Sequence, residues 1–328
     1  MTTPANVCVL GSINMDLVVQ SPRFAHPGET VLGGVFETFP GGKGANQAIA
    51  AQRIGAVASL IGCVGGDAYG RELIDCIARS GVQLTGLEIR ENAATGVGVI
   101  TIDRNTGENM IVVASGANMQ VTAQQIDRAR QVIERASILL LQLEVPMRAN
   151  VHAAGIAREA GVRVILNAAP ARDLPPELLG AIDALVVNRA EAAALTGLAP
   201  DASPRNTMER LQMYGLEHIV LTLGAEGAIV AERGECALVP APRVNAVDTV
   251  GAGDAFTGAL AAALASGRPM MDAARLATAA GSLAVTKPGA IPSLPDGAEV
   301  RALAELIDVV AMETVADPDR RSERLSAG

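Results

Sequence analysis

The sequence has few residues that could form a metal site or a disulfide framework. Its four cysteines (Cys8, Cys63, Cys76 and Cys236) include no CxxC pair, and its three histidines form no HExxH pattern. These spacings argue against a structural zinc site. They predict reduced cysteines, as is typical of a cytoplasmic protein.

Basic residues are also scarce. The 328 residues include 26 Lys and Arg against 35 Asp and Glu, which gives a formal net charge of −9. A nucleic-acid backbone is bound by clustered Lys and Arg, so we expect no nucleic-acid partner. The amino terminus lacks the basic region of a signal peptide, and no apolar run reaches the ~18 residues of a membrane span. We therefore expect a soluble, cytoplasmic protein without a membrane partner.

Short apolar runs alternate with Ala-rich helical stretches along most of the chain. Strands are predicted at 7–10, 57–64, 138–143, 162–166, 183–187 and 219–223, and helices at 44–54, 69–79, 147–159, 252–266 and 298–312. Apolar strands alternating with helices are typical of a parallel sheet covered on both faces. The predicted fold class is α/β.

Two stretches depart from this alternation. Residues 13–20 alternate apolar and polar side chains, and 95–102 with 109–114 have the pattern of a hairpin around the turn-rich 103–108. Neither stretch is followed by a crossover helix. We therefore predict a second, small sheet that projects from the α/β body as a lid, since lids exclude water from reacting phosphates.

The sharpest chemical candidate is VDTVGAGDAFTG at 247–258, which opens a predicted helix. Its small residues let the backbone approach a ligand, and amides at a helix start favour an anion. Asp254 falls in the first turn, where a carboxylate also stabilises the helix dipole without any chemical role. The same arrangement fits phosphoryl transfer, with the amides holding developing charge and the carboxylate accepting a hydroxyl proton.

A second candidate is PGGKGAN at 40–46, before another predicted helix. It is not a Walker A loop, which would need Gly at Glu37 and Ser or Thr at Gly44. GAGDAF does not complete a GxGxxG motif, so a dinucleotide-binding oxidoreductase is poorly supported. The segment is either a turn with a helix start or a backbone surface from which Gly42 and Asn46 contact a small polyol.

Three further segments carry polar side chains on a predicted strand or directly after one. Asn14 and Asp16 share one face of their strand and could bind two sugar hydroxyls. Glu144 follows an apolar strand, either as a solvated strand end or as a hydroxyl ligand at the edge where α/β proteins bind ligands. Asn188 and Glu191 could hold a hydrated magnesium ion, although NxxE is also a common helix start.

Together these segments resemble the ribokinase family of PfkB-type carbohydrate kinases from about residue 6 to residue 310. The resemblance includes GSINMD (11–16), GGKGANQA (41–48), LLQLEVP (140–146), NRAE (188–191), LTLGAEGA (221–228), AVDTVGAGDAFTGAL (246–260) and AVTKPGAIPS (284–293). It implies a ribokinase-like fold, with a body at 1–12, 41–92 and 115–312 and a lid at 13–40 and 93–114. The stretch at 313–328 lies outside the resemblance, and its polar, charged composition predicts a disordered tail. It also implies transfer of the ATP γ-phosphate to the 5-hydroxyl of D-ribose.

The resemblance further implies a role for each matching residue. Asp254 would be the general base, and the amides of Gly251, Ala252, Gly253 and Asp254 the anion hole. The sugar would contact Asn14, Asp16, Gly42, Lys43, Asn46, Glu144 and Asp254. The nucleotide would contact Asn188, Thr222, Leu223, Gly224, Ala225, Glu226, Gly227, Gly253 and Thr278. Thr278 stands where the family's bacterial members have a larger side chain.

Two metal ions and a homodimer are implied in the same way. Potassium, or a similar monovalent activator, would be bound by Asp248, Val250, Ala284, Lys287, Gly289 and Ser293, mostly through backbone carbonyls. Mg²⁺ would accompany ATP, with Glu191 in its network. The lid is the expected dimer contact.

Other functions remain open from the sequence. A deoxyribose or nucleoside kinase would share GGKGAN and GAGD, although the GSINMD start favours ribose. A non-catalytic sugar-binding relative would have no need of Asp254. A dehydrogenase is the third alternative.

Overall fold

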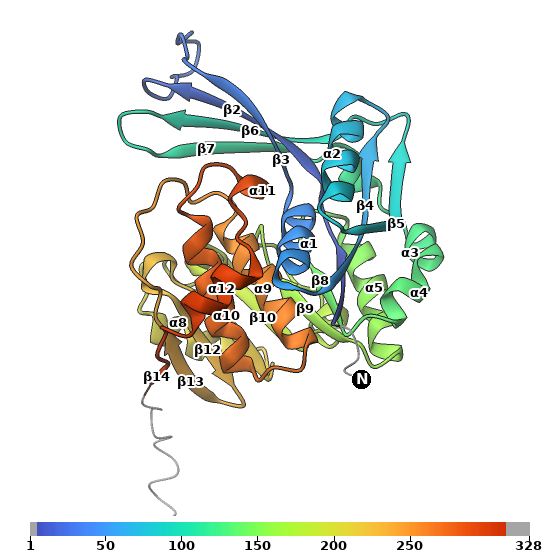
Figure 1. The fold of residues 1–328 in the computed structure, drawn as a ribbon, viewed down its shortest axis with the longest axis vertical. Helices are drawn as coiled ribbons and strands as arrows, with labels where there is room; N and C mark the ends of the chain where they lie inside the picture. Colours follow the sequence, from blue (N-terminus) through green and yellow to red (C-terminus); the bar gives the residue numbers. More distant parts are fainter. Residues whose placement is uncertain (1–4, 313–328) are drawn as a thin grey trace, which may run out of the picture.

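The computed structural model describes residues 5–312, so the predicted tail at 313–328 lies outside the described residues. Within them, ten strands form one large sheet in the order β14-β13-β12-β11-β10-β9-β8-β1-β4-β5 (Figure 1). The parallel strands are β1 (Asn6–Leu10), β4 (Val57–Gly65), β5 (Gln83–Arg90), β8 (Ile138–Leu141), β9 (Arg163–Asn167), β10 (Ala184–Asn188) and β11 (His218–Thr222). An antiparallel edge follows, made of β12 (Ala228–Glu232), β13 (Glu235–Val239) and β14 (Val310–Ala311).

Helices cover both faces of this sheet. One face packs against α1 (Lys43–Ile54), α2 (Ala68–Arg79), α9 (Ala252–Ala265), α10 (Met270–Ala284), α11 (Ala290–Ser293) and α12 (Gly297–Ala304). The other packs against α3 (Ala123–Arg128), α4 (Arg130–Glu134), α5 (Met147–Glu159), α6 (Pro176–Leu179), α7 (Arg189–Thr196) and α8 (Pro204–Gln212). In β1, Val7 and Val9 enter one core while Cys8 and Leu10 enter the other. This two-sided burial explains the continuous apolar run in the sequence.

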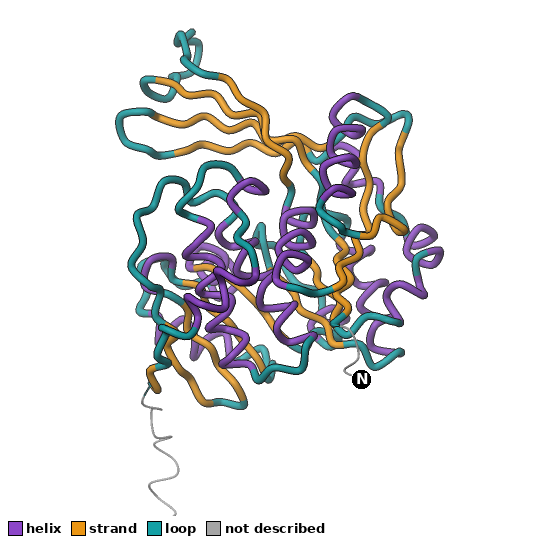
Figure 2. Tube along the Cα trace, viewed as in Figure 1, coloured by secondary structure: helices purple, strands orange, loops and turns teal. Residues whose placement is uncertain are grey.

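A second sheet projects from the body, as Figures 1 and 2 show. Its order is β3-β2-β6-β7, with β2 at Asn14–Ser21, β3 at Phe36–Gly41, β6 at Gly96–Asp103 and β7 at Asn109–Ala114. β2 pairs antiparallel with β3 and parallel with β6. The mostly parallel α/β body and the small separate sheet confirm the predicted fold class.

One predicted element was wrong. The helix expected at 298–312 is α12, which ends at Ala304, and the chain then forms β14. Val310 pairs with Leu238 and Ala311 with Ala237, so pairing to the sheet edge replaces the helical pattern there. Strands β12 and β13 were not predicted, because they form an antiparallel hairpin without the helices that mark the rest of the sheet.

Among the described helices, none has both the length and the apolarity of a membrane span.

Candidate functional site

The first side of the site is the inner face of β2. Asn14 lies opposite Gly96 on β6, and Asp16 lies opposite Gly98. A methyl group on either glycine would collide with the polar group across from it, at 2.2 Å from Asn14 Oδ1 or 2.7 Å from Asp16 Oδ1. The Asn14 oxygen also accepts a hydrogen bond of 2.7 Å from Asn118 Nδ2. The two predicted sugar ligands therefore share one face, with glycines leaving room for their side chains.

The second side is the glycine-rich start of α1. Gly42 has φ +92°, and a Cβ there would lie 2.6 Å from Asn14 N. A Cβ on Gly44 would lie 2.5 Å from the carbonyl carbon of Gly11. Only glycine permits both the positive φ and these backbone approaches. The motif thus brings Lys43 and Asn46 under β2.

The third side is the first turn of α9, where Gly251 has φ +80°. Asp254 is 8% exposed, and both carboxylate oxygens accept hydrogen bonds from α1. Asn46 Nδ2 donates to Oδ2 at 2.8 Å, and Gln47 Nε2 donates to Oδ1 at 2.9 Å. The carboxylate is therefore fixed by side chains from more than 200 positions earlier in the sequence.

These three sides enclose a cavity of about 260 Å³. It is lined by Asn14, Asp16, Gly42, Lys43, Asn46, Gly98, Ile100, Asn109, Ile111, Val113, Glu144, Thr249, Val250, Gly251 and Asp254. All seven residues predicted to bind the sugar are among them. Asn46 Oδ1 is buried there without a hydrogen-bond partner in the described structure, which leaves it available to a ligand hydroxyl.

The charged groups of this cavity shift one another's pKa values. Burial, then Glu144 and Asp254, raise the pKa of Asp16 to about 7, although Lys43 opposes this. Burial lowers the pKa of Lys43, but the surrounding carboxylates Asp254, Glu144, Glu191 and Asp16 raise it above its ordinary value. Glu144 accepts a hydrogen bond from the Ser12 hydroxyl. The half-buried Lys43 ammonium thus interacts with several carboxylates around a cavity that suits a polar ligand.

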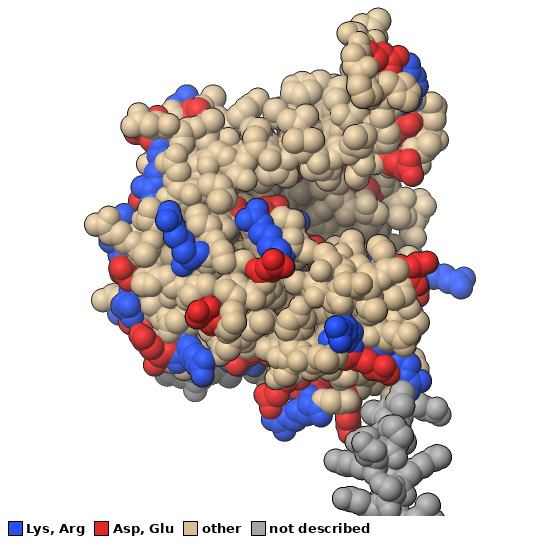
Figure 3. All heavy atoms as spheres, turned by 180° about the vertical axis from the view of Figure 1, so that it is seen from behind, with Lys and Arg blue, Asp and Glu red and all other residues tan. Residues whose placement is uncertain are grey.

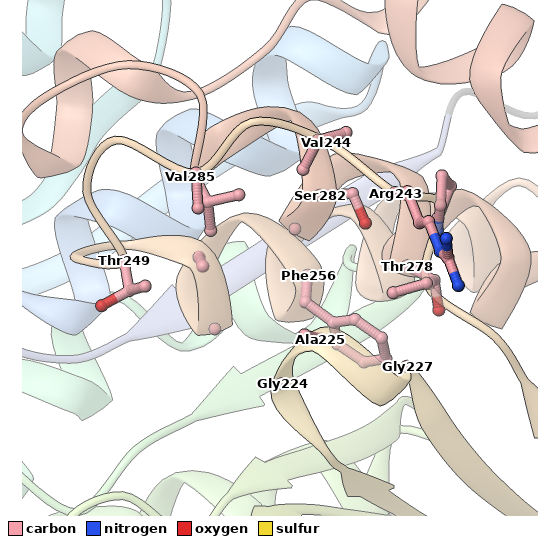
Figure 4. Close-up of a pocket in the computed structure, with 16 residues that line it drawn as sticks. Gly224, Ala225, Gly227, Arg243, Val244, Thr249, Phe256, Thr278, Ser282 and Val285 are labelled. Atoms are coloured by element: carbon pink, nitrogen blue, oxygen red, sulfur yellow. The ribbon is translucent and has the colours of Figure 1, made fainter.

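A larger cavity of about 560 Å³, whose lining residues are drawn in Figure 4, adjoins the first across the α9 start. Thr249 lines both cavities, while Gly251 and Asp254 face the smaller one and Ala252 and Gly253 the larger. A Cβ on Gly253 would meet only open space. The remaining walls are mainly apolar, from Gly224, Ala225, Gly227, Ala241, Pro242, Arg243, Val244, Ala246, Phe256, Thr278, Gly281, Ser282 and Val285. The volume and the apolar lining suit a nucleoside-sized ligand.

Only part of the predicted nucleotide set lines this cavity. Gly224, Ala225, Gly227, Gly253 and Thr278 do so, whereas Asn188, Thr222, Leu223 and Glu226 are not among its lining residues. The hydroxyl of Thr222 donates to Val187 O, and Glu226 pairs with Arg189 at 2.8 Å. The wall at 241–246 was not predicted, because that loop mixes apolar residues with Arg243 and Asn245 and contains no recognisable motif.

Asn188 and Glu191 satisfy each other as a capping box at the start of α7. Asn188 N donates to Glu191 Oε2 at 2.8 Å, and Glu191 N donates to Asn188 Oδ1 at 2.9 Å. Burial raises the pKa of Glu191, partly offset by the Asn188 hydrogen bond and by Lys43. The helix-start explanation of NxxE therefore applies, and the carboxylate also lies within electrostatic range of Lys43 and Asp254.

The segments predicted to bind potassium lie together beside the α9 start. Asp248 Oδ1 accepts from Val250 N at 3.0 Å, and Oδ2 accepts from Gly289 N at 2.8 Å. Val247 N donates to Val285 O at 2.7 Å. One carboxylate thus ties the loop before α9 to the chain between α10 and α11, which contains Lys287 and Gly289. Ala284 is the last residue of α10, and Ser293 is the last residue of α11.

Three buried amide side chains near Asp254 were missed by the sequence analysis: Gln47, Gln142 and Asn167. Gln47 and Gln142 each stand in a motif, but their polarity within otherwise apolar segments is the only local signal. Their hydrogen bonds join α1, β9 and the loop after β8, so the grouping exists only in the folded chain.

The space-filling view in Figure 3 shows the surface hollowed beneath the projecting sheet. The sheet and the loop before β3 expose several large apolar side chains: Leu32, Val35, Phe36, Met110, Ile111, Val112 and Val113. Ile111 and Val113 line the smaller cavity, so this face of β7 points toward it. The sheet therefore roofs the cavity while leaving other apolar groups uncovered.

Comparison with known proteins finds carbohydrate kinases of one family, both by sequence and by structure. The model of the pfkB family carbohydrate kinase matches residues 4–297. A ribokinase of Haemophilus influenzae is 39% identical over 289 residues, which cover 88% of this chain and 94% of that protein. A ribokinase of Bacillus subtilis is 38% identical over 299 residues, covering 91% and 99%. The structure of Arabidopsis thaliana ribokinase complexed with ribose and ATP aligns with a TM-score of 0.85 and 33% identity, over 93% of this chain and 99% of that one.

Proposed function

The chain belongs to the pfkB family of carbohydrate kinases, and we propose that it transfers the γ-phosphate of ATP to the 5-hydroxyl of D-ribose. The observation that carries this proposal is the pair of cavities that meet at the first turn of α9. The smaller is polar and suits a sugar, while the larger is mainly apolar and suits a nucleotide base. Asp254 stands on the sugar side of the boundary, where a hydroxyl would meet a phosphate.

In this mechanism, Asp254 accepts the proton of the 5-hydroxyl as the hydroxyl oxygen attacks the γ-phosphorus. The bond from the γ-phosphorus to the β–γ bridging oxygen breaks, and ADP leaves. The amides of Gly251, Ala252, Gly253 and Asp254 stabilise the charge that develops on the transferred group. Asn14, Asp16, Gly42, Lys43, Asn46 and Glu144 hold the sugar so that its hydroxyl faces Asp254.

The residues present fit a magnesium ion that arrives with the nucleotide. Within residues 5–312, no three His, Cys, Asp or Glu side chains form a group that could hold a metal ion. Mg²⁺ keeps several waters and binds phosphates with few protein ligands, so it needs no such group. Bound to ATP, the ion would neutralise phosphate charge. Glu191, with Asn188 beside it, would orient its waters.

The residues near Asp248 fit a monovalent cation. This donor set consists of one carboxylate and backbone carbonyls, which are the hard oxygen ligands that potassium accepts. Asp248 already bridges Val250 and Gly289. We infer that potassium, when bound by Asp248, Val250, Ala284, Lys287, Gly289 and Ser293, fixes the anion-hole loop without touching the substrate.

We also propose a cytoplasmic homodimer. ATP as the phosphoryl donor and the four free cysteines favour the cytoplasm. The exposed apolar side chains of the lid favour a second copy of the chain as its partner. Leu32, in the loop before β3, is 88% exposed, and Val112 on β7 is 68% exposed.

The test is ATP consumption by the purified protein with Mg²⁺, D-ribose and potassium, beside parallel reactions with 2-deoxyribose, fructose and adenosine. We expect a ribose-dependent rate that falls when sodium replaces potassium. A rate only with another acceptor would keep the kinase and reject ribose as substrate. No rate with any acceptor, while ribose still raises the melting temperature, would instead indicate a non-catalytic sugar-binding protein.

A further inference from the structure

The Asp254 carboxylate is bound to the central sheet through one buried amide. Gln47 lies on α1 and is 0% exposed. Its Nε2 donates to Asp254 Oδ1 at 2.9 Å and to Asn167 Oδ1 at 3.0 Å. Its Oε1 accepts from Gln142 Nε2 at 2.6 Å. Both protons and the oxygen of this amide are therefore used inside the protein.

The polarity of this network follows from its two ends. An ionised carboxylate only accepts hydrogen bonds, so Gln47 must present its NH₂ group to Asp254. At the other end, Val186 O accepts from Asn167 Nδ2 at 3.2 Å, which turns Asn167 Oδ1 toward Gln47. That oxygen also requires an N–H donor. Gln47 therefore has one orientation only.

The anchor points lie on rigid parts of the fold. Asn167 is the last residue of β9, Val186 belongs to β10, and Gln142 directly follows β8. Gln47 thus connects the first turn of α9 to three adjacent strands of the parallel sheet. Asn46 differs from its neighbour: it also lines the sugar cavity, and its Oδ1 is unpartnered there. Gln47 is not among the residues lining that cavity.

We propose that Gln47 is a positioning residue for the reaction, holding the Asp254 carboxylate aimed at the sugar hydroxyl without touching the substrate. This inference rests on the proposed function, because it assigns the general-base role to Asp254. A donor that bonds only the charged carboxylate favours its ionised form. Fixing one carboxylate oxygen also leaves a defined lone pair for the incoming proton.

Other charged groups act on the same carboxylate. Asp16 on β2, Lys43 on α1 and Glu191 on α7 interact electrostatically with Asp254, and Glu144 after β8 lines the same cavity. All four groups remain when Gln47 is replaced. A change in pH dependence between wild type and a Gln47 variant therefore reports the lost hydrogen bond.

The experiment compares Gln47→Leu and Gln47→Glu with the wild type by steady-state kinetics across pH. Leu keeps the approximate volume and removes the donor, whereas Glu keeps the shape and places a second carboxyl group against Asp254. For Gln47→Leu we expect kcat to fall about 10²-fold and the acid limb of the kcat profile to move up by about one pH unit. For Gln47→Glu we expect a larger upward shift, because two adjacent carboxylates cannot both ionise. The ribose KM of the Leu variant should change less than about threefold.

Two matched variants separate positioning from general destabilisation. Asn46→Leu removes the other donor to Asp254 but also a cavity wall, so it should raise the ribose KM as well as lower kcat. Gln125→Leu removes a buried amide that bonds Gly62 O and Gly86 O instead. It should lower the melting temperature and leave the pH profile unchanged.

The outcomes distinguish this inference from the proposed function. If the wild type shows no ribose-dependent ATP consumption, the proposed function fails first. Suppose that the wild type is active, and that Gln47→Leu folds and has the same dependence of kcat on pH as the wild type. The inference is then overturned, while the kinase assignment remains. Should Gln47→Leu not fold, Asn167→Leu removes the anchor and leaves the Gln47 amide in place. An unshifted acid limb and an unchanged kcat in that variant would overturn the inference equally.

Discussion

Asp16 on β2 lies directly opposite Gly98 on β6, and a methyl group on Gly98 would come within 2.7 Å of Asp16 Oδ1. Gly41 borders the other carboxylate oxygen, where a Cβ would lie 2.3 Å from Oδ2. The carboxylate therefore occupies a space that two glycines on neighbouring strands leave open. Asp16, the proposed ligand of the sugar, can take this position only because Gly41 and Gly98 have no side chains.

Replacing Gly98 by Ala should weaken ribose binding. The added methyl group forces Asp16 to shift, which misplaces one charge-assisted hydrogen bond to the sugar. We expect the ribose KM to rise about tenfold, the equivalent of roughly 1.5 kcal/mol, while the KM for ATP stays unchanged. Steady-state kinetics with each substrate varied in turn measures both values.

The matched control is Gly155→Ala in α5, where a Cβ would meet nothing within 4 Å. Alanine in a helix interior is favoured over glycine by about 0.5–1 kcal/mol. This variant should therefore be slightly more stable, with kinetics like the wild type. An unchanged ribose KM in Gly98→Ala would show that Asp16 does not contact the sugar.

The pKa of Asp16, raised to about 7, predicts a pH dependence of ribose capture. Sugar hydroxyls donate best to an ionised carboxylate, so kcat/KM for ribose should fall as the pH drops through about 7. Asp16→Asn should have a lower kcat/KM at pH 8 and should lack this inflection. A wild-type profile that is flat between pH 6 and 8 would contradict the prediction.

The raised pKa of Asp16 also makes folding stability depend on pH. This stability should fall as the pH rises, whereas kcat/KM for ribose should rise. The folded-state pKa of Asp16 lies above its unfolded value of about 3.9. The folded state therefore binds this proton more tightly, and the stabilisation is full below about pH 4 and lost as the pH rises through about 7. Asp16→Asn, which carries no charge, should gain melting temperature relative to the wild type from pH 5 to pH 8. Thermal unfolding without ribose measures this difference.

Asp254→Asn tests the general base. The amide cannot accept a proton from the 5-hydroxyl, so turnover should fall about 10²–10⁴-fold. One oxygen of the wild-type carboxylate becomes an NH₂ group that faces the donor of Asn46 or Gln47, so sugar binding should survive but weaken. Calorimetric titration with ribose, beside the kinetic measurement, separates the two effects. A near-normal rate would reject Asp254 as the base.

Much of the fold and of the proposed sugar site could be predicted from local sequence. The buried strands show continuous apolar runs because both faces of the sheet are covered, as in β1 and β8. The motifs with Asn14, Lys43 and Asp254 are recognisable because each needs glycine or a small residue where backbones approach closely. Such constraints leave a mark within a few positions of the functional residue.

The rest depends on contacts between distant segments. The wall of the larger cavity at 241–246 is a loop of ordinary composition, with Arg243 among apolar neighbours, and its role arises only where it faces α10. Gln47 has a partner 207 positions away in Asp254 and another 120 away in Asn167. The helix predicted up to residue 312 ended early because an edge strand supplied alternative hydrogen bonds. No local pattern carries this information.

Asp248 connects two loops that the proposed cation site shares. Its carboxylate bonds Val250 N and Gly289 N, and the first of these lies directly before Gly251. Asp248→Asn keeps the size of the side chain but removes its charge, which a bound cation requires. We expect activation by KCl over NaCl to be lost, with kcat near the wild-type value measured in sodium and a ribose KM changed less than about threefold. Thermal unfolding in KCl and in NaCl provides the control: the wild type should be more stable in KCl, and the variant should melt at the same temperature in both salts. If the variant still responds to potassium as the wild type does, then the cation is bound elsewhere, and the hydrogen bonds of Asp248 serve only to join the two loops.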